Sequence, residues 1–165
     1  MSNDVREILS DEHLAALRGA YNRNIMVHVA TTLTMSNYTD SKGWFDFLAA
    51  RHYNPDENRP GMTDQNRERC LIAVFAAGRR APFALASHVY WGLMEGMSVD
   101  DVADTILLSS AYAGVDVFAD GMFTLGETLR VLSFLAAKGG DSLSPVAALT
   151  TLVNGFRVRP SANLA

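Results

Sequence analysis

The sequence contains a single cysteine, Cys70, among its 165 residues. One cysteine cannot close an internal disulfide or supply a multi-cysteine metal site, so both are excluded and a reducing compartment is permitted. No apolar run approaches the roughly 18 residues of a membrane-spanning helix. The first residues are acidic where a secretory signal would be basic. We therefore expect a cytoplasmic protein with no membrane partner.

Lysine is also scarce, since only Lys42 and Lys138 are lysines among 14 basic residues. The 18 acidic residues give a net charge of −4 and a pI near 5.5, which argues against nucleic acid as a partner. The excess of arginine has two interpretations. It reflects genomic base composition, or some arginines hold a carboxylate through the two-point fork that lysine lacks.

The chain has enough apolar residues, 48% against 19% charged, to fill one core. No segment alternates with period two between hairpin turns, and no repeat indicates a solenoid. We therefore predict one domain over residues 1–165, all-α, folded as a compact helical bundle. Apolar spacing and capping residues predict helices over 10–21, 25–35 (which could also be a strand), 40–53, 63–77, 82–94, 98–113, 118–136 and 145–155, with a loop at 54–62 and a tail from 157.

Two apolar stripes accompany these helices. One is predicted from Cys70, Leu71, Val74 and Phe75. The other follows a 4-3-4-3-4 spacing along the longest helix and needs a partner helix, in this chain or in a neighbouring subunit. It consists of Phe118, Met122, Leu125, Leu129, Leu132 and Ala136.

His88 is the main candidate for a functional residue, because it lies within a helix that is apolar nearly all round. Ala84 and Gly92 flank it by one turn on either side, leaving room for another helix or for a ligand. A buried, hydrogen-bonded structural histidine is one interpretation. A general acid or base is the other, since histidine ordinarily titrates near neutral pH.

Arginines and a glutamate surround this helix in the sequence. Arg79 and Arg80 precede it, and Arg67 and Arg69 lie on the helix before, either as a solvated basic turn or as a clamp for an anion. Glu68 is interpreted as a surface charge or, alternatively, as a pocket carboxylate.

The aromatic residues near this helix, Tyr90, Trp91 and Tyr112, belong to the core or an interface, or else bind substrate. His13, His28 and His52 show no ligand spacing, so we predict no metal site. No glycine-rich nucleotide motif is present, and we expect no cofactor.

A longer pattern carries a family resemblance. The run from His88 through Gly96, Ser98 and Asp101 to Tyr112-Ala-Gly114 resembles the carboxymuconolactone decarboxylase/alkylhydroperoxidase D family. The resemblance covers about residues 59–135, while residues 1–55 do not match. It implies the alkylhydroperoxidase D-like helical fold and a homotrimer or homohexamer.

The peroxidase branch of that family carries Cys-x-x-Cys-x-x-x-His, whose cysteines would fall at Ala81 and Ala84. Cys70 cannot replace that dithiol, so a disulfide relay is not expected. Arg59-Pro-Gly-Met62 and Gly78-Arg79 are similar to the decarboxylase branch. The resemblance then implies cofactor-free loss of CO2 from a small unsaturated lactone acid.

In that chemistry an arginine would orient the substrate carboxylate, and His88 would protonate the carbon left by CO2, with Glu68 as a second candidate for proton transfer. Three functions remain open at this point. They are a decarboxylase-like lyase or related isomerase acting on a small organic acid, a Cys70-dependent peroxidase, and a non-catalytic binding or assembly module.

Overall fold

The computed structural model describes residues 5–19, 62–79 and 82–157. All regular structure in these residues is helical, as predicted. The predictions for 25–35, 40–53, 54–61 and the tail after 157 lie outside the described residues. The α-helices are α1 (Asp11–Arg18), α4 (Asp64–Gly78), α5 (Pro82–Met94), α6 (Val99–Ala113), α7 (Val115–Lys138) and α8 (Pro145–Arg157), with short 3-10 helices at Val5–Glu7 and Gly140–Ser142.

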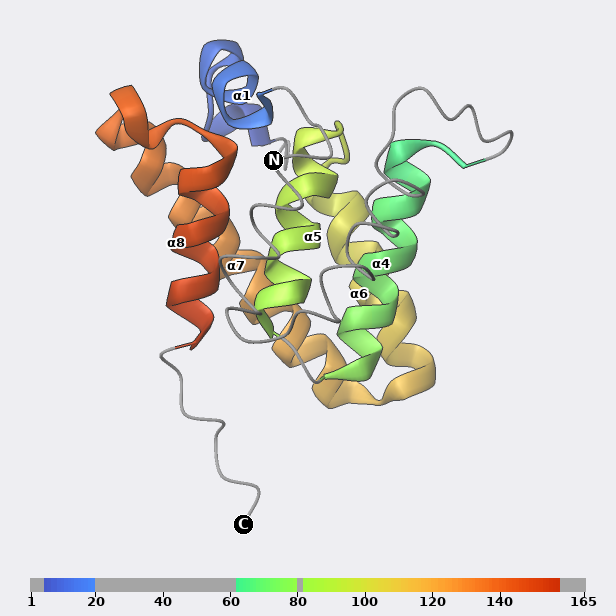
Figure 1. Cartoon of the computed structure of the whole chain (residues 1–165). Coiled ribbons are helices and arrows are strands. Elements are labelled where there is room, and N and C mark those ends of the chain that lie inside the picture. Colours follow the sequence, from blue (N-terminus) through green and yellow to red (C-terminus); the bar gives the residue numbers. More distant parts are fainter. Residues whose placement is uncertain (1–4, 20–61, 80–81, 158–165) are drawn as a thin grey trace, which may run out of the picture.

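Helix α5 is the hub of the described bundle. It contacts α1, α4, α6, α7 and α8. Figure 1 shows α4, α5 and α8 side by side, with α6 and α7 behind them and α1 at one end of the bundle. This position explains why α5 is apolar nearly all round, since eight of its thirteen residues are buried.

Local capping chemistry sets the helix starts where the sequence predicted them. Thr63 Oγ1 accepts a hydrogen bond from the Asn66 N–H at the start of α4. Ser98 and Asp101 form a reciprocal capping box at the start of α6. The backbone N–H and the hydroxyl of Ser98 hold the pKa of Asp101 below its usual range, with a smaller contribution from Arg69.

The long helix α7 runs over Val115–Lys138 and contains the whole predicted seam. Its predicted seam is buried at Leu125 and Leu132, and its other members are partly buried against the core. The partners of α7 are α4, α5, α6 and α8 of the same chain. The seam is therefore covered within the chain.

The predicted apolar stripe of α4 is wrong. Cys70 and Val74 are exposed, and Leu71 and Phe75 are half-buried. The buried face instead consists of Arg67, Glu68, Ile72 and Ala76. A hydrophobicity pattern does not find this face because it begins with two charged residues, whose partners are Asp64 and each other on α4, and His88 on α5.

Close approach of α6 and α7 depends on Gly121. A Cβ built at this position would overlap Ile106 Cγ2 and would lie 3.4 Å from Ile106 Cγ1. Ile106 is fully buried. The missing side chain at Gly121 is what allows α7 to pack against this β-branched residue.

The described helices were also compared with the length and apolar character of a membrane-spanning helix, and none of them has both.

Candidate functional site

The hairpin formed by α4 and α5 holds a histidine–carboxylate pair. His88 Nδ1 lies 2.8 Å from Glu68 Oε2. Glu68 is on the second turn of α4 and His88 is midway along α5, so their contact joins the two helices. The Glu68 side chain is fully buried and that of His88 is 12% exposed. A hydrogen bond to a carboxylate in such a low-dielectric setting is stronger than the same bond at the surface.

Arg67 completes the surroundings of the Glu68 carboxylate. Arg67 Nε lies 3.2 Å from Glu68 Oε1, and Arg67 Nη1 lies 2.6 Å from Asp64 Oδ1. The Arg67 side chain is itself mostly buried. Each oxygen of Glu68 therefore has its own partner, Arg67 on one side and His88 on the other. A buried carboxylate needs such partners, because transferring one charge from water into the protein interior costs a free energy on the order of several kcal/mol.

The walls of the pair are apolar. The Phe75 ring stacks on the His88 imidazole, with 5.0 Å between ring centroids and 9° between planes. A Cβ built at Gly92 would lie 3.7 Å from Glu68 Cβ, 3.2 Å from Ile72 Cδ1 and 2.9 Å from Met97 Sδ. The room that the sequence predicted beside His88 is thus filled, at Gly92, by α4 and Met97.

The geometry fixes which ring nitrogen can do chemistry. When Glu68 is ionised, its carboxylate only accepts hydrogen bonds, so Nδ1 then carries the proton that is donated to Glu68. In the neutral ring Nε2 is then the basic nitrogen, and in the imidazolium it is a proton donor. Among the described residues, none forms a hydrogen bond with Nε2 of His88. The carboxylate orients the ring and stabilises the charge that appears when Nε2 takes a proton.

Comparison of the chain with models of protein families, with curated proteins and with solved structures found no match. The resemblance to the carboxymuconolactone decarboxylase/alkylhydroperoxidase D family therefore stays a prediction.

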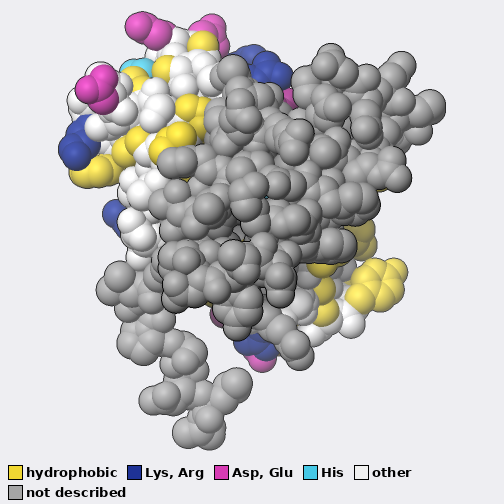
Figure 2. Space-filling model, in the orientation of Figure 1, with side chains coloured by type: hydrophobic (Ala, Val, Ile, Leu, Met, Phe, Trp, Pro, Cys, Tyr) yellow, Lys and Arg dark blue, Asp and Glu magenta, His cyan; other side chains and the backbone are white. Residues whose placement is uncertain are grey.

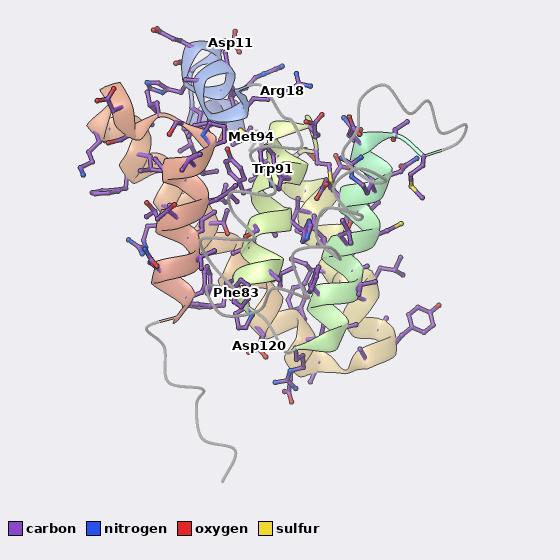
Figure 3. All side chains as sticks on the ribbon, in the orientation of Figure 1. Asp11, Arg18, Phe83, Trp91, Met94 and Asp120 are labelled. Carbon is purple, nitrogen blue, oxygen red and sulfur yellow. The ribbon has the colours of Figure 1, made fainter. Side chains whose placement is uncertain are left out.

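The described arginines of the predicted clamp are all paired with carboxylates. Arg67 lies at the pair but is bound to Asp64 and Glu68, and Arg69 lies 3.1 Å from Asp101 on α6. Arg79 ends α4, eleven residues or about 16 Å along the helix from Glu68. Its guanidinium lies 2.8 Å from Asp120 and 3.7 Å from Asp116, both on α7. Figure 3 shows Asp120 at the opposite end of the bundle from Arg18. Arg80 lies outside the described residues.

The three predicted aromatic residues are spread over different environments. Tyr90 and Trp91 are fully buried in the core, and the Tyr90 hydroxyl donates to the backbone carbonyl of Leu17 in α1. Burial raises the pKa of Tyr90, so its hydroxyl stays protonated. Tyr112 is 89% exposed near the end of α6. None of the three has a hydrogen bond or ring contact with His88 in the described structure.

Sequence reasoning treated two residues of this site differently from what the structure shows. The interpretation of Glu68 as a surface charge is wrong, because the residue is completely buried. Asp64, which was not among the predicted site residues, lies 2.6 Å from Arg67 Nη1. The i,i+3 spacing of Asp64 and Arg67 was the available signal.

Within the described residues, no three His, Cys, Asp or Glu side chains are grouped as metal ligands.

Proposed function

We propose that the protein is a cofactor-independent enzyme that moves a proton on a small organic acid, as a decarboxylase-like lyase or a related isomerase. The buried Glu68–His88 pair is the observation that supports this proposal. Two titratable side chains from different helices meet inside a low-dielectric setting, and one of them is histidine. The predicted substrate class is an unsaturated lactone acid or a similar conjugated acid.

For decarboxylation, the C–C bond to the substrate carboxylate breaks and its electron pair passes into the conjugated carbonyl, releasing neutral CO2. The imidazolium of His88 then gives its Nε2 proton to the resulting carbanionic carbon. Glu68 stabilises the imidazolium before this step, and water returns the proton afterwards. For isomerisation, neutral Nε2 removes a proton from one carbon and returns it to another. Neither route uses Arg79, which is paired with α7.

A non-catalytic binding or assembly module is the second candidate. The observation in its favour is that both oxygens of Glu68 already have partners within the bundle. Fully satisfied buried polar networks often serve to specify one packing arrangement rather than to react. In this case His88 would be a structural residue that fastens α5 to α4.

A Cys70-dependent peroxidase is less well supported by the geometry. Cys70 is exposed, and two residues along a helix place it about 200° around α4 from Glu68. The thiol therefore projects away from the histidine–carboxylate pair, which leaves no described base beside it for activation.

The experiment that tests the proposal measures CO2 release and absorbance with carboxymuconolactone and a panel of conjugated acids. His88→Gln and Glu68→Gln are expected to lose turnover by at least 100-fold, the lower range of a general acid–base contribution. Cys70→Ser is the matched control on α4 and should retain full turnover. Turnover that survives in His88→Gln would remove His88 from the chemistry, and binding of an acid without turnover would favour the module.

We also propose that the chain assembles as a homotrimer or homohexamer. The supporting observation is a set of exposed apolar side chains where α6 meets α7, namely Leu107, Leu108, Tyr112 and Val115. Contiguous exposed apolar surface of this kind is typical of subunit interfaces. Light scattering should give a multiple of 18.0 kDa, and Leu108→Glu should lower it. A wild-type monomer at micromolar concentration would contradict this assembly.

A further inference from the structure

A cavity of about 640 Å³ lies between α1 and the turn that joins α5 to α6. Its volume is within the range of small-molecule sites, which is about 300–1,000 Å³. The apolar part of its lining includes Leu14 of α1, Leu93 and Met94 at the end of α5, and Met97 in the turn that follows. Figure 3 shows Arg18 and Met94 close together at this end of the bundle. The described lining does not include Glu68 or His88, so this cavity is a different site from the histidine–carboxylate pair.

The charged residues of the described lining include two ion pairs. Arg6 Nε lies 3.8 Å from Asp11 Oδ1, and Arg18 Nη2 lies 3.2 Å from Glu95 Oε2. Figure 2 shows both kinds of charge mixed with hydrophobic side chains at the end of the molecule where α1 lies. The described lining therefore places a buried ion pair beside an apolar floor.

Glu95 is the carboxylate with the least solvent. Its side chain is 6% exposed and lies 3.2 Å from Arg18 Nη2, whereas the Arg18 side chain is 58% exposed. Burial, above all, raises the pKa of Glu95. Asp64 and Glu68 raise it further, and Arg18 and Arg67 only partly oppose them. The half-exposed guanidinium of Arg18 therefore offsets only part of the cost of burying the ionised Glu95 carboxylate.

We propose that this cavity binds a small organic cation, a primary ammonium on a short apolar chain. The ammonium donates to the Glu95 carboxylate in place of Arg18, and the chain packs against Leu14, Met94 and Met97. Arg18, being largely in solvent, loses little when it is displaced. Thioether side chains adapt readily to chains of different shape, which suits a site with two methionines in its floor.

An organic anion fits the same lining poorly. An acid in place of the amine would put a second carboxylate against the buried Glu95 carboxylate, with Arg18 as their shared cation. The buried Glu95 carboxylate therefore favours an amine over an acid of the same length.

The test uses the full chain with ¹³C-labelled methionine methyl groups, assigned through Met94→Leu and Met97→Leu. Hexylammonium, hexanoate and 1-hexanol are titrated in turn at neutral pH. The Met94 and Met97 methyl signals should shift with the amine at concentrations at least tenfold below those needed for the alcohol or the acid. Equal shifts with all three probes, no shift with hexylammonium, or a preference for hexanoate, would overturn the proposal.

Two variants with opposite expected effects sharpen the test. Glu95→Gln should weaken hexylammonium binding at least tenfold, while Glu12→Gln, an exposed position on α1 outside the lining, should leave it unchanged. Arg18→Gln should strengthen binding severalfold, because it removes the competing cation. If Glu95→Gln does not fold, Arg18→Gln decides alone, and weaker amine binding in that variant would refute the site.

Discussion

Replacing Gly121 by alanine tests the closest contact between α6 and α7. Alanine is favoured over glycine in a helix interior by about 0.5–1 kcal/mol. At Gly121 the new methyl group would overlap Ile106 Cγ2, and Ile106 is a fully buried, β-branched side chain with little freedom to turn away. Overpacking of this kind costs about 1–3 kcal/mol. We therefore expect the clash to cancel or exceed the helical gain.

Gly126 on the same helix is the matched control, because a Cβ built there meets no atom within 4 Å. Gly126→Ala should raise the free energy of unfolding by the helical gain alone. The helical term is the same in both variants, so Gly121→Ala should be less stable than Gly126→Ala by the overpacking cost, about 1–3 kcal/mol. At about 2–4 °C per kcal/mol for a chain of this size, their Tm values should differ by roughly 2–12 °C.

Urea unfolding followed by circular dichroism measures both free energies, and Ile106→Ala supplies the coupling. Ile106→Ala alone should cost about 2–5 kcal/mol through the cavity that it leaves. Combined with Gly121→Ala, the cost should be smaller than the sum, because the new methyl group enters space vacated by Ile106. Equal stability of the two glycine variants, or additive costs in the double variant, would refute this packing of α6 against α7.

Three further variants probe charged residues. Glu68→Ala should lower the free energy of unfolding in urea by about 3–5 kcal/mol, because it removes the buried partner of Arg67 and His88. A decrease below about 1 kcal/mol would contradict the burial of the pair. The pKa of Asp101 is lowered in the folded state, so its stabilisation is present above the unfolded value near 3.8 and is lost as pH falls through the lower folded value. Asp101→Asn should therefore flatten the loss of stability below about pH 4, and an unchanged acid limb in a pH series of thermal melts would count against the capping box. Arg79→Ala, which breaks only exposed ion pairs, should change stability by less than about 1 kcal/mol and leave turnover intact; a large loss of turnover would instead support its predicted role on a substrate carboxylate.

Features that depend on neighbouring residues were predictable from the sequence. Thr63 and Ser98 cap their helices through bonds to residues three positions on, and Pro82 begins α5 because its fixed backbone suits a first turn. The all-helical class of the described residues follows from the same local signals.

Features that depend on distant residues were not predictable. Arg79 looked like a ligand for a substrate because its partners, Asp116 and Asp120, lie about forty residues away on α7. Glu68 looked like a surface charge because its burial depends on a hydrogen bond with His88 from α5. The spacing of apolar residues along α4 does not reveal a buried charged residue whose partner lies on another helix. Whether His88 and Glu68 are catalytic stays a prediction that turnover measurements will decide.

The hub position of α5 also has a consequence for synthesis on the ribosome. Among the described helices, α1 precedes α5 and α8 follows it, and both pack on this helix. Sixty-three residues separate the end of α5 at Met94 from the end of α8 at Arg157. Translation adds about 5–20 residues per second. The surface of α5 that contacts α8 therefore stays without this partner for roughly 3–13 s after α5 has been synthesised. The core around α5 is therefore complete only after α8 has been made.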